Sequence, residues 1–443
     1  FWGDSPDAAI HMIRNADIQY MGCDYLAELT LSIMAKQQLK DPTKGFAPDF
    51  TTRILKEAGK EAWDKHIKIC TNAGGMNING CVDGIRQWAE GNSMSGYKIG
   101  YVTGDNIKDK IPQLLKDGWT FPNFDYDGNF NDILDKIYNC NVYIGHEGIE
   151  GCLAEGADVV ITGRAADSAL FLAPLKYEFG WAADDWDNLA RGIMAGHLLE
   201  CAGQVTGGYF ADPGYKDVPD LWKLGFPLIE IDETGAFTVT KVEGSGGLVS
   251  VDTCKEQMIY EIHNPKAYLT PDATADFSKV TFRQIGENQV CAEHATTHGR
   301  PETLKVSVGY KDCFIGEGEI SYGGSNCMAR AELAAEILEK RIELTGIELE
   351  EYRTDFIGCN SLYRDAISKE IGSGTPCEVR LRAAGRTKDR KNAVLLANEV
   401  EALYTNGPAG GGGAVKRVSE VVSVCSIFVP RDDVTQKIRY FEV

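Results

Sequence analysis

The feature that most constrains this sequence is a repeat in which a short β-branched run ends at polar residues and a helix-like stretch follows. Within Asn141–Gly208, the runs Val142–Ile144 and Val159–Thr162 flank a helix-like segment that ends at Gly156. Gly145-His146-Glu147 follows the first run, and Gly163-Arg164-Ala165-Ala166-Asp167-Ser168 follows the second. Because ligands of open parallel sheets bind outside the carboxyl ends of the strands, these polar residues indicate a site.

The same alternation runs through the first 205 residues. Further strand-like runs lie at Ile18–Cys23, Ile67–Thr71 and Lys98–Thr103, and helix-like stretches separate them. Repeated β-α units of this kind predict an α/β fold, with a doubly wound and mostly parallel sheet over residues 1–205. Beyond that point the pattern changes to hairpins, such as the one at Glu233-Thr234-Gly235. We therefore predict a second, α+β domain over residues 206–443.

Charge and composition exclude several classes of partner. The chain has 443 residues, of which 43% are hydrophobic, and a formal net charge of −20. An acidic protein of ordinary composition is a poor match for nucleic acid or an anionic membrane surface. No apolar run is long enough for a membrane span. The 13 cysteines are scattered without a C-x-x-C pair, which is typical of a reducing compartment. We expect an intracellular, cytoplasmic protein, with the mitochondrial or peroxisomal matrix as alternatives.

The turn over Asn72–Asn79 is the first candidate ligand-binding segment. It contains two glycines and three asparagines between a strand-like run and a helix-like stretch. Glycines let a ligand approach the backbone, and a helix N-terminus offers amide hydrogens to an anion. Asn72, Gly74, Gly75 and Asn77 are therefore candidate substrate-binding residues. The turn matches no named nucleotide motif, and a tight structural turn is the alternative.

The two strand ends of the opening stretch supply further candidates. Arg164 is placed to clamp a carboxylate or phosphate, and Ser168 to contact the substrate. Asp167 is a candidate base, or else the cap of the next helix. His146 and Glu147 are a candidate acid–base pair. The alternative for that pair is one helix cap beside one solvated side chain.

His197 and Glu200 are three residues apart on a helix-like stretch, so they share a face. Such a pair serves proton transfer or metal binding, and both residues are catalytic candidates. We assign no metal ligands and no certain cofactor, because H-x-x-E alone is a weak motif; a divalent metal is the alternative. Cys201 follows directly and is an alternative nucleophile.

Two segments of the second half complete the candidate site. Glu317, Glu319 and Ser321 alternate along a strand-like run and so face one side. Glu319 is a candidate acid–base group and Ser321 a substrate-binding residue, although like charges at this spacing also occur when both have structural partners. Asn406 and Gly407 begin a glycine-rich loop that we expect to wrap a ligand, with a plain surface loop as the alternative.

Seven motifs, in order over essentially the whole chain, are similar to one known family. They are FWGDSPDAA, DYLAELTLSIMA, TNAGGMN, EGADVVITGRAADSAL, GHLLECAGQVTGG, LKVSVGYKDCFIGEGEISYGG and ALYTNGPAGGGGA. Together they resemble the acyclic terpene utilisation AtuA family, which is linked to the breakdown of citronellol and geraniol through branched acyl-CoA intermediates. Family members usually begin with a strand before the Phe-Trp-Gly-Asp loop, and many carry a small C-terminal α+β domain beyond the position of Val443.

The resemblance implies a catabolic enzyme. With the acid–base candidates above, we predict a lyase or hydratase that acts on a branched acyl-CoA or hydroxyacyl thioester. The alternatives are a thioester hydrolase with Cys201 or Ser168 as nucleophile, which no G-x-S-x-G elbow supports, and a non-catalytic acyl-CoA-binding subunit. We expect a small-molecule thioester or carboxylate as partner, and a homo-oligomer that includes a small C-terminal-type domain from outside these residues. The Asn72–Asn79 turn and the Glu317–Gly323 strand are expected to form the other walls of the site.

Overall fold

A five-stranded mixed sheet organises the N-terminal part of the chain. Its strands, in spatial order, are β1 (Tyr20–Cys23), β2 (Lys68–Thr71), β5 (Val159–Thr162), β3 (Lys98–Thr103) and β17 (Lys437–Glu442). The first four strands are parallel to their neighbours, and β17 runs antiparallel to β3. The predicted α/β fold is thus confirmed as a mixed α/β architecture, while the doubly wound arrangement stays a prediction.

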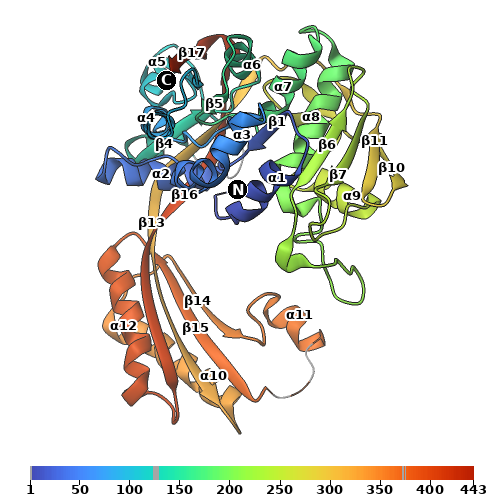
Figure 1. Ribbon diagram of the computed structural model, residues 1–443. Helices are drawn as coiled ribbons and strands as arrows, with labels where there is room; N and C mark the ends of the chain where they lie inside the picture. Colours follow the sequence, from blue (N-terminus) through green and yellow to red (C-terminus); the bar gives the residue numbers. More distant parts are fainter. Residues whose placement is uncertain (1, 123–128, 372–373, 375) are drawn as a thin grey trace. The chain divides into compact units, whose positions relative to one another are not determined.

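The computed structural model describes residues 2–122, 129–371, 374 and 376–443, which divide into two units (Figure 1). The first unit comprises Phe1–Gly309 and Val424–Val443, and the second comprises Tyr310–Ser423. Two long strands, β13 (Thr303–Gly323) and β16 (Gly412–Pro430), contribute residues to both units. The predicted boundary between residues 205 and 206 falls inside the first unit.

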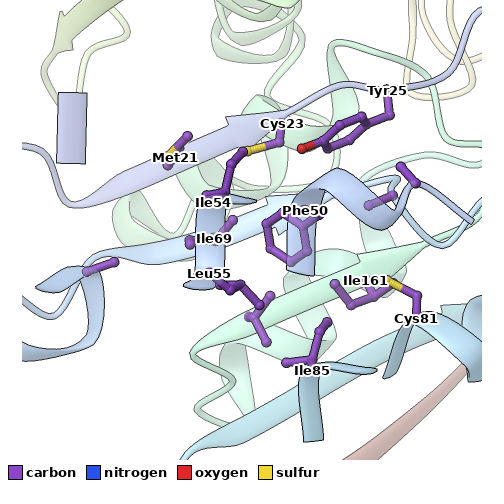
Figure 2. Packing of buried hydrophobic residues seen from close by; sticks show 14 of the residues in the cluster. Met21, Cys23, Tyr25, Phe50, Ile54, Leu55, Ile69, Cys81, Ile85 and Ile161 are labelled. Atoms are coloured by element: carbon purple, nitrogen blue, oxygen red, sulfur yellow. The ribbon is translucent and has the colours of Figure 1, made fainter. Parts of the chain in front are cut away.

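Helices of the first unit bury apolar side chains against strands or against one another. They are α1 (Pro6–Asn15), α2 (Glu28–Lys40), the π-helix η1 (Phe50–Gly59), α3 (Lys60–Asp64), α4 (Ile78–Gly91), α6 (Glu147–Ala154), α7 (Ala169–Phe179) and α8 (Trp186–Glu200). In the core, Phe50, Ile54 and Leu55 of η1 meet Ile69 and Ile161 of the strands (Figure 2). Full burial of one such side chain contributes about 1.5–3 kcal/mol.

The first helix follows the local signals of its sequence. The Ser5 side chain caps α1 by accepting a hydrogen bond from the Asp7 amide at 3.4 Å, and Pro6 lies in the first turn. A proline is tolerated there because that position has no intrahelical partner for an amide hydrogen. Ser5 and Pro6 together therefore mark the start of this helix.

The first strand predicted within Asn141–Gly208, at Val142–Ile144, differs from the strand in the structure. The strand is β4 (Ile137–Val142), which ends before Tyr143 and pairs with β13 rather than with the parallel sheet. Its buried amides form hydrogen bonds, from Asn139 to Asn141 at 3.2 Å and from Asn141 to Asp105 at 2.8 Å. A β-branched pattern gives no sign of such polar contacts. The predicted run, Val142–Ile144, therefore lies several residues beyond the start of the observed strand. An isolated parallel bridge between Ile144 and Ala165 still holds the two strand ends together.

The remainder of the first unit contains two antiparallel sheets. One has the order β10 (Thr281–Gly286), β11 (Gln289–Glu293), β7 (Phe237–Lys241) and β6 (Pro227–Ile231), and the smaller one β12 (Thr296–Thr297), β9 (Thr274–Asp276) and β8 (Tyr268–Leu269). The hairpin at Glu233-Thr234-Gly235 is confirmed, because β6 and β7 pair antiparallel around it. Leu189 and Ile193 of α8 share a core with Phe237 and Val239 of this region.

Short helices complete the first unit. They are η2 (Lys108–Lys110), α5 (Ile111–Lys116), η3 (Phe130–Lys136), η4 (Ala202–Gln204), η5 (Leu221–Lys223), α9 (Val251–Ile259) and η6 (Arg431–Asp433). Of the helices in the described part of the chain, none combines the length and apolar composition needed to span a bilayer.

The second unit is an antiparallel sheet with helices. Its strands follow the order β14 (Glu351–Ile357), β15 (Glu378–Thr387), β13 and β16, and its helices are α10 (Cys327–Thr345), α11 (Arg364–Ile371) and α12 (Arg390–Asn406). Ala331, Ala334 and Leu338 of α10 join Val400 and Leu403 of α12 in the core beneath the sheet.

Candidate functional site

A cavity of about 380 Å³ lies at the carboxyl ends of β1 and β5 in the first unit. Its lining brings together Arg164 and Asp167, which follow β5, with His197 and Glu200 at the end of α8. The helix approaches the turn closely because a Cβ atom at Gly196 would lie only 2.7 Å from the Ser168 Cα. The turn after β5 and the His197–Glu200 pair, which are separate in the sequence, therefore line the same cavity.

Arg164 is held within the protein on several sides. Its Nη2 lies 2.8 Å from Asp167 Oδ1, its Nη1 donates to the Leu26 carbonyl, and its guanidinium carbon lies 4.1 Å from the Tyr143 ring centroid. Both terminal nitrogens are thus engaged. The buried Nε has no hydrogen-bond partner among the described residues. The predicted bidentate clamp on a substrate anion has no free pair of nitrogens for that purpose.

Asp167 is a partly buried carboxyl beside this arginine. Burial raises the pKa of Asp167 well above its usual range; the positive charge of Arg164 opposes this, and the nearby Asp24 and Glu200 carboxylates add to the increase. A raised pKa keeps a proton on the carboxyl closer to neutral pH, as a general acid requires.

His197 and Glu200 form a buried pair. Nδ1 of His197 lies 2.8 Å from Glu200 Oε1, and Nε2 donates to the Met258 carbonyl at 3.1 Å. Burial lowers the pKa of His197, but the contact with Glu200 outweighs it and raises the pKa overall. Burial also raises the pKa of Glu200. The second oxygen, Glu200 Oε2, is buried without a hydrogen-bond partner among the described residues.

Three cavity residues escaped the sequence prediction. Tyr143 donates its hydroxyl to Glu28 Oε1, and Lys305 Nζ lies 3.3 Å from the same oxygen. Burial alone would raise the pKa of Glu28, but the charges of Arg164 and Lys305 and the Tyr143 hydrogen bond hold it at about 2. No local pattern singles out these residues, because their partners are more than a hundred positions away.

Asp24 also lines the cavity, and the predicted turn positions it. Asn72 is buried; its Nδ2 donates to Asp24 Oδ1, and its Oδ1 accepts from the Tyr25 amide at 2.7 Å. Asp24 follows directly after β1, so the strand-end rule that selected Arg164 would also have found it.

The other residues of the Asn72–Asn79 turn have roles within the fold. A Cβ atom at Gly74 would lie 2.6 Å from the Thr162 carbonyl oxygen, and Gly75 adopts φ +49 against Met34 Sδ. Asn77 caps α4 by accepting from the Gly80 amide at 3.0 Å. None of these three described residues lines the cavity.

His146 pairs with residues other than the predicted Glu147. Its Nδ1 lies 2.6 Å from Asp272 Oδ1 and its Nε2 lies 3.4 Å from Glu150, while Glu147 contacts Arg300. Burial would raise the pKa of Asp272, but the contact with His146 outweighs it and lowers the pKa. His146 does not line the cavity, and Asp272 connects it to the Thr270–Pro271 segment that does.

The two alternative nucleophiles lie near the site in unreactive states. Ser168 Oγ is buried and has no hydrogen-bond partner among the described residues, so no base is placed to activate it. Cys201 lines the cavity, and burial followed by the charge of Glu200 raises the pKa of its thiol. A raised pKa keeps the thiol protonated, and the thiolate is the nucleophile.

The carboxylates of the second unit are paired with arginines of neighbouring strands. Glu317 Oε2 lies 2.7 Å from Arg382 and its Oε1 contacts Arg417, while Glu319 contacts Arg380. Arg380 also donates to Ser321 Oγ at 2.9 Å. This face of the unit is a network of cross-strand ion pairs.

Asn406 and Gly407 lie where α12 ends in the same unit. The Gly407 amide donates to the Leu403 carbonyl at 3.0 Å, which closes the last turn. Arg330 donates to the Ala409 carbonyl at 2.7 Å and so fastens the start of the glycine-rich loop. The contacts of this loop end are with its own unit.

A second cavity, of about 570 Å³, adjoins the first. Both cavities are lined by Asp24 and Glu200, and the second extends between β1, α7, α8 and β6 along mostly apolar side chains. Within the described residues, no group of three or more histidine, cysteine, aspartate or glutamate side chains is arranged to hold a metal ion.

Comparisons with known proteins give one match. A search of curated proteins found no match, and a search of solved structures found none either. The family model described as "Acyclic terpene utilisation family protein AtuA" matches residues 1–440. The chain therefore belongs to the AtuA family.

Proposed function

We propose that this protein is an acid–base enzyme of acyclic terpene breakdown, a lyase or hydratase that acts on a branched acyl-CoA or hydroxyacyl thioester. The observation that carries the proposal is that Asp167 and the His197–Glu200 pair, whose pKa values are all raised, line one cavity. Membership of the AtuA family supports the link to acyclic terpenes.

Addition of water to a carbon–carbon double bond requires one group that takes a proton and one that gives a proton. In this proposal Glu200 Oε2, which is buried without a partner among the described residues, takes a proton from water as its oxygen attacks carbon. Asp167 gives its proton to the acyl group on the other side. Elimination of water reverses both transfers, so each group must be stable with and without its proton.

The cavity also suits the hydrocarbon part of such a substrate. Leu26, Leu269 and Phe428 line it beside the acid–base groups. Its volume of about 380 Å³ lies in the range of about 300–1,000 Å³ that is common for small-molecule sites. A cavity of this size takes the acyl group, and the CoA portion would extend outside it.

The hydrolase and binding-subunit alternatives receive less support from the geometry. A serine hydrolase needs a base beside its nucleophile, and Ser168 Oγ has no hydrogen-bond partner among the described residues. Burial raises the pKa of the Cys201 thiol, which opposes nucleophilic attack. A purely binding subunit would have no use for three acid–base groups with raised pKa values in one cavity.

The test is turnover and proton exchange by the purified full chain. Branched unsaturated and hydroxyacyl thioesters are incubated in deuterated water, and deuterium uptake into the acyl group is followed by mass spectrometry. We expect uptake with the native chain and its loss in Asp167→Asn. Asp83→Asn on the surface of α4 is the matched control and retains full exchange. Binding without exchange, unchanged in Asp167→Asn, would overturn the proposal.

A further inference from the structure

Two strand edges face the second cavity, of about 570 Å³. β1 is an outermost strand of the five-stranded sheet, and β6 is an outermost strand of the β10–β11–β7–β6 sheet. The cavity is lined by every residue from 17 to 25 and by every residue from 226 to 231. Successive side chains of a strand point to opposite faces. A cavity that meets all of them therefore lies along the edge of the strand and not on one face.

The backbone of β1 directs hydrogen-bonding groups to this cavity. On the β2 side, the Gln19 carbonyl accepts from the Lys68 amide at 3.0 Å. Because successive residues of a strand direct their backbone groups to opposite sides, those of Tyr20 and Gly22 point away from β2. Within the described part of the chain, β2 is the only strand paired with β1, and β7 is the only strand paired with β6. Two strand edges without a further partner thus border one space.

These edges define the chemistry of what fills the cavity. The N–H and C=O groups along a strand edge are satisfied by another strand, which supplies acceptors and donors at the matching spacing. A hydrocarbon chain supplies neither. The occupant that fits this cavity is therefore an extended polypeptide segment.

Apolar side chains cover both faces of the cavity. On one face Phe171 of α7 lies against Gly22, where a Cβ atom would clash with its ring. On the other face Met21 and Cys23 pack with Ile54 of η1 (Figure 2). Strands of parallel sheets that are covered on both faces have nearly continuous apolar sequences. We therefore expect an apolar segment of about five residues, which is also the length of β6.

The residues before α1 lead to the same cavity. Gly3, Asp4 and Ser5 line it, and α1 follows directly and packs Ala9 and Ile13 into the core that contains β1 residues. β1 is the next strand along the chain. A strand in the cavity that continued through this loop and α1 into β1 would complete a unit of two parallel strands and a crossover helix. Loops of about 2–6 residues between strand and helix are usual in such units.

From these contacts we propose that the second cavity is the position of a further β-strand, formed by the residues directly before Phe1 in a longer form of this chain. This strand pairs with the outer edge of β1 in the parallel direction and lies beside β6. Its carboxyl end lies next to Asp24 and Glu200, which line both cavities, because parallel strands end at the same edge of a sheet. The strand thereby completes a wall of the candidate site, whichever reaction that site performs.

The test is amide hydrogen exchange, resolved to single residues by mass spectrometry, on the 443-residue chain and on the longer natural chain. We expect Tyr20 and Gly22 to exchange about ten-fold more slowly or less in the longer chain, because their amides gain a strand partner. Met21 and Cys23 already face β2 and should change little. β10, the opposite edge strand of the β6 sheet, is the control and should exchange equally in both chains.

The longer chain alone also decides the proposal, even if the shorter chain does not fold. In it, Tyr20 and Gly22 should exchange as slowly as Met21 and Cys23, and fast exchange at the first two residues overturns the proposal. A longer chain without an extended apolar segment before Phe1 overturns it as well. So does slow exchange that appears only at high protein concentration, because that dependence indicates a strand from a second copy of the chain.

Discussion

The two units contain carboxylates that look alike in the sequence and differ in their surroundings. Glu317 of the second unit contacts Arg382 and Arg417, and these charges outweigh burial and lower its pKa. Glu200 of the first unit contacts His197, but burial outweighs that contact and raises its pKa. The difference teaches that the balance between burial and the charges of the partners, rather than the residue type, decides whether the pKa of a carboxylate is raised or lowered.

The largest expected effect is on catalysis in the first unit. Glu200→Gln removes the proposed proton acceptor while keeping the size of the side chain. We expect kcat to fall by about 100-fold or more, the usual contribution of a general acid or base. Steady-state kinetics on a branched thioester measures this fall. If Glu200→Gln retained native kcat while Glu317→Gln lost it, the comparison between the two units would be reversed.

The next effect is on stability in the second unit. Glu317→Ala leaves Arg382 and Arg417 without their shared carboxylate. We expect a loss of about 1–2 kcal/mol in the free energy of unfolding, less than for a fully buried pair because the arginines are partly solvated. Urea denaturation measures the loss, and kcat should stay at the native level. Glu317→Gln, which keeps the shape and one acceptor oxygen, should recover part of the stability.

The pH dependence of stability should have opposite sign for the two kinds of carboxylate. For Glu317 the folded pKa is lowered from 4.5, so its stabilising contribution is complete above that pH and is lost as the pH falls toward the lowered value. For Asp167 the folded pKa is raised from 3.8, so its contribution is complete below that pH and is lost as the pH rises through the raised value.

Melting temperatures across the pH range test this contrast. Glu317→Gln should flatten the decline in melting temperature on the acid side, and Asp167→Asn should flatten the decline that follows as the pH rises above the ordinary aspartate range. A native chain whose profile is unchanged by either substitution would show that neither carboxylate has a shifted pKa.

The smallest effect is expected at an exposed ion pair. Lys340 and Glu336 lie one turn apart on α10, with side chains that are 71% and 55% exposed. Solvent screens such pairs, and the flexible side chains lose entropy on pairing. Glu336→Gln should therefore leave both the denaturation midpoint and kcat at native values. A clear loss of stability would show that exposure matters less than the comparison assumes.

Local patterns in the sequence predicted the strands and several of the site residues. The β-branched runs gave β1, β2, β3 and β5, and the strand-end rule selected Arg164 and Asp167. Helical spacing placed His197 and Glu200 on one face, and they do contact each other. Each of these inferences needed only neighbouring positions.

The pairings between distant residues could not be read in the same way. His146 contacts Asp272, and Glu317 contacts Arg382, across 126 and 65 positions respectively. Lys305 reaches the cavity from the start of β13. A local pattern does not specify which lysine or arginine will contact a given carboxylate. The sequence therefore could not distinguish carboxylates that have a cationic partner from those that have none.

Gly196 has a consequence for how this site responds to change. The glycine lets α8 lie directly on the turn after β5, with Ser168 where a side chain would otherwise be. Asp167 is adjacent to Ser168 and Glu200 is one helical turn beyond Gly196, so this contact separates the proposed proton donor from the proposed proton acceptor. A methyl group at position 196 would clash with Ser168 and so push Asp167 and Glu200 apart, although it would contact neither of them. The missing side chain at position 196 would therefore set the distance between the two groups of the proposed proton transfer.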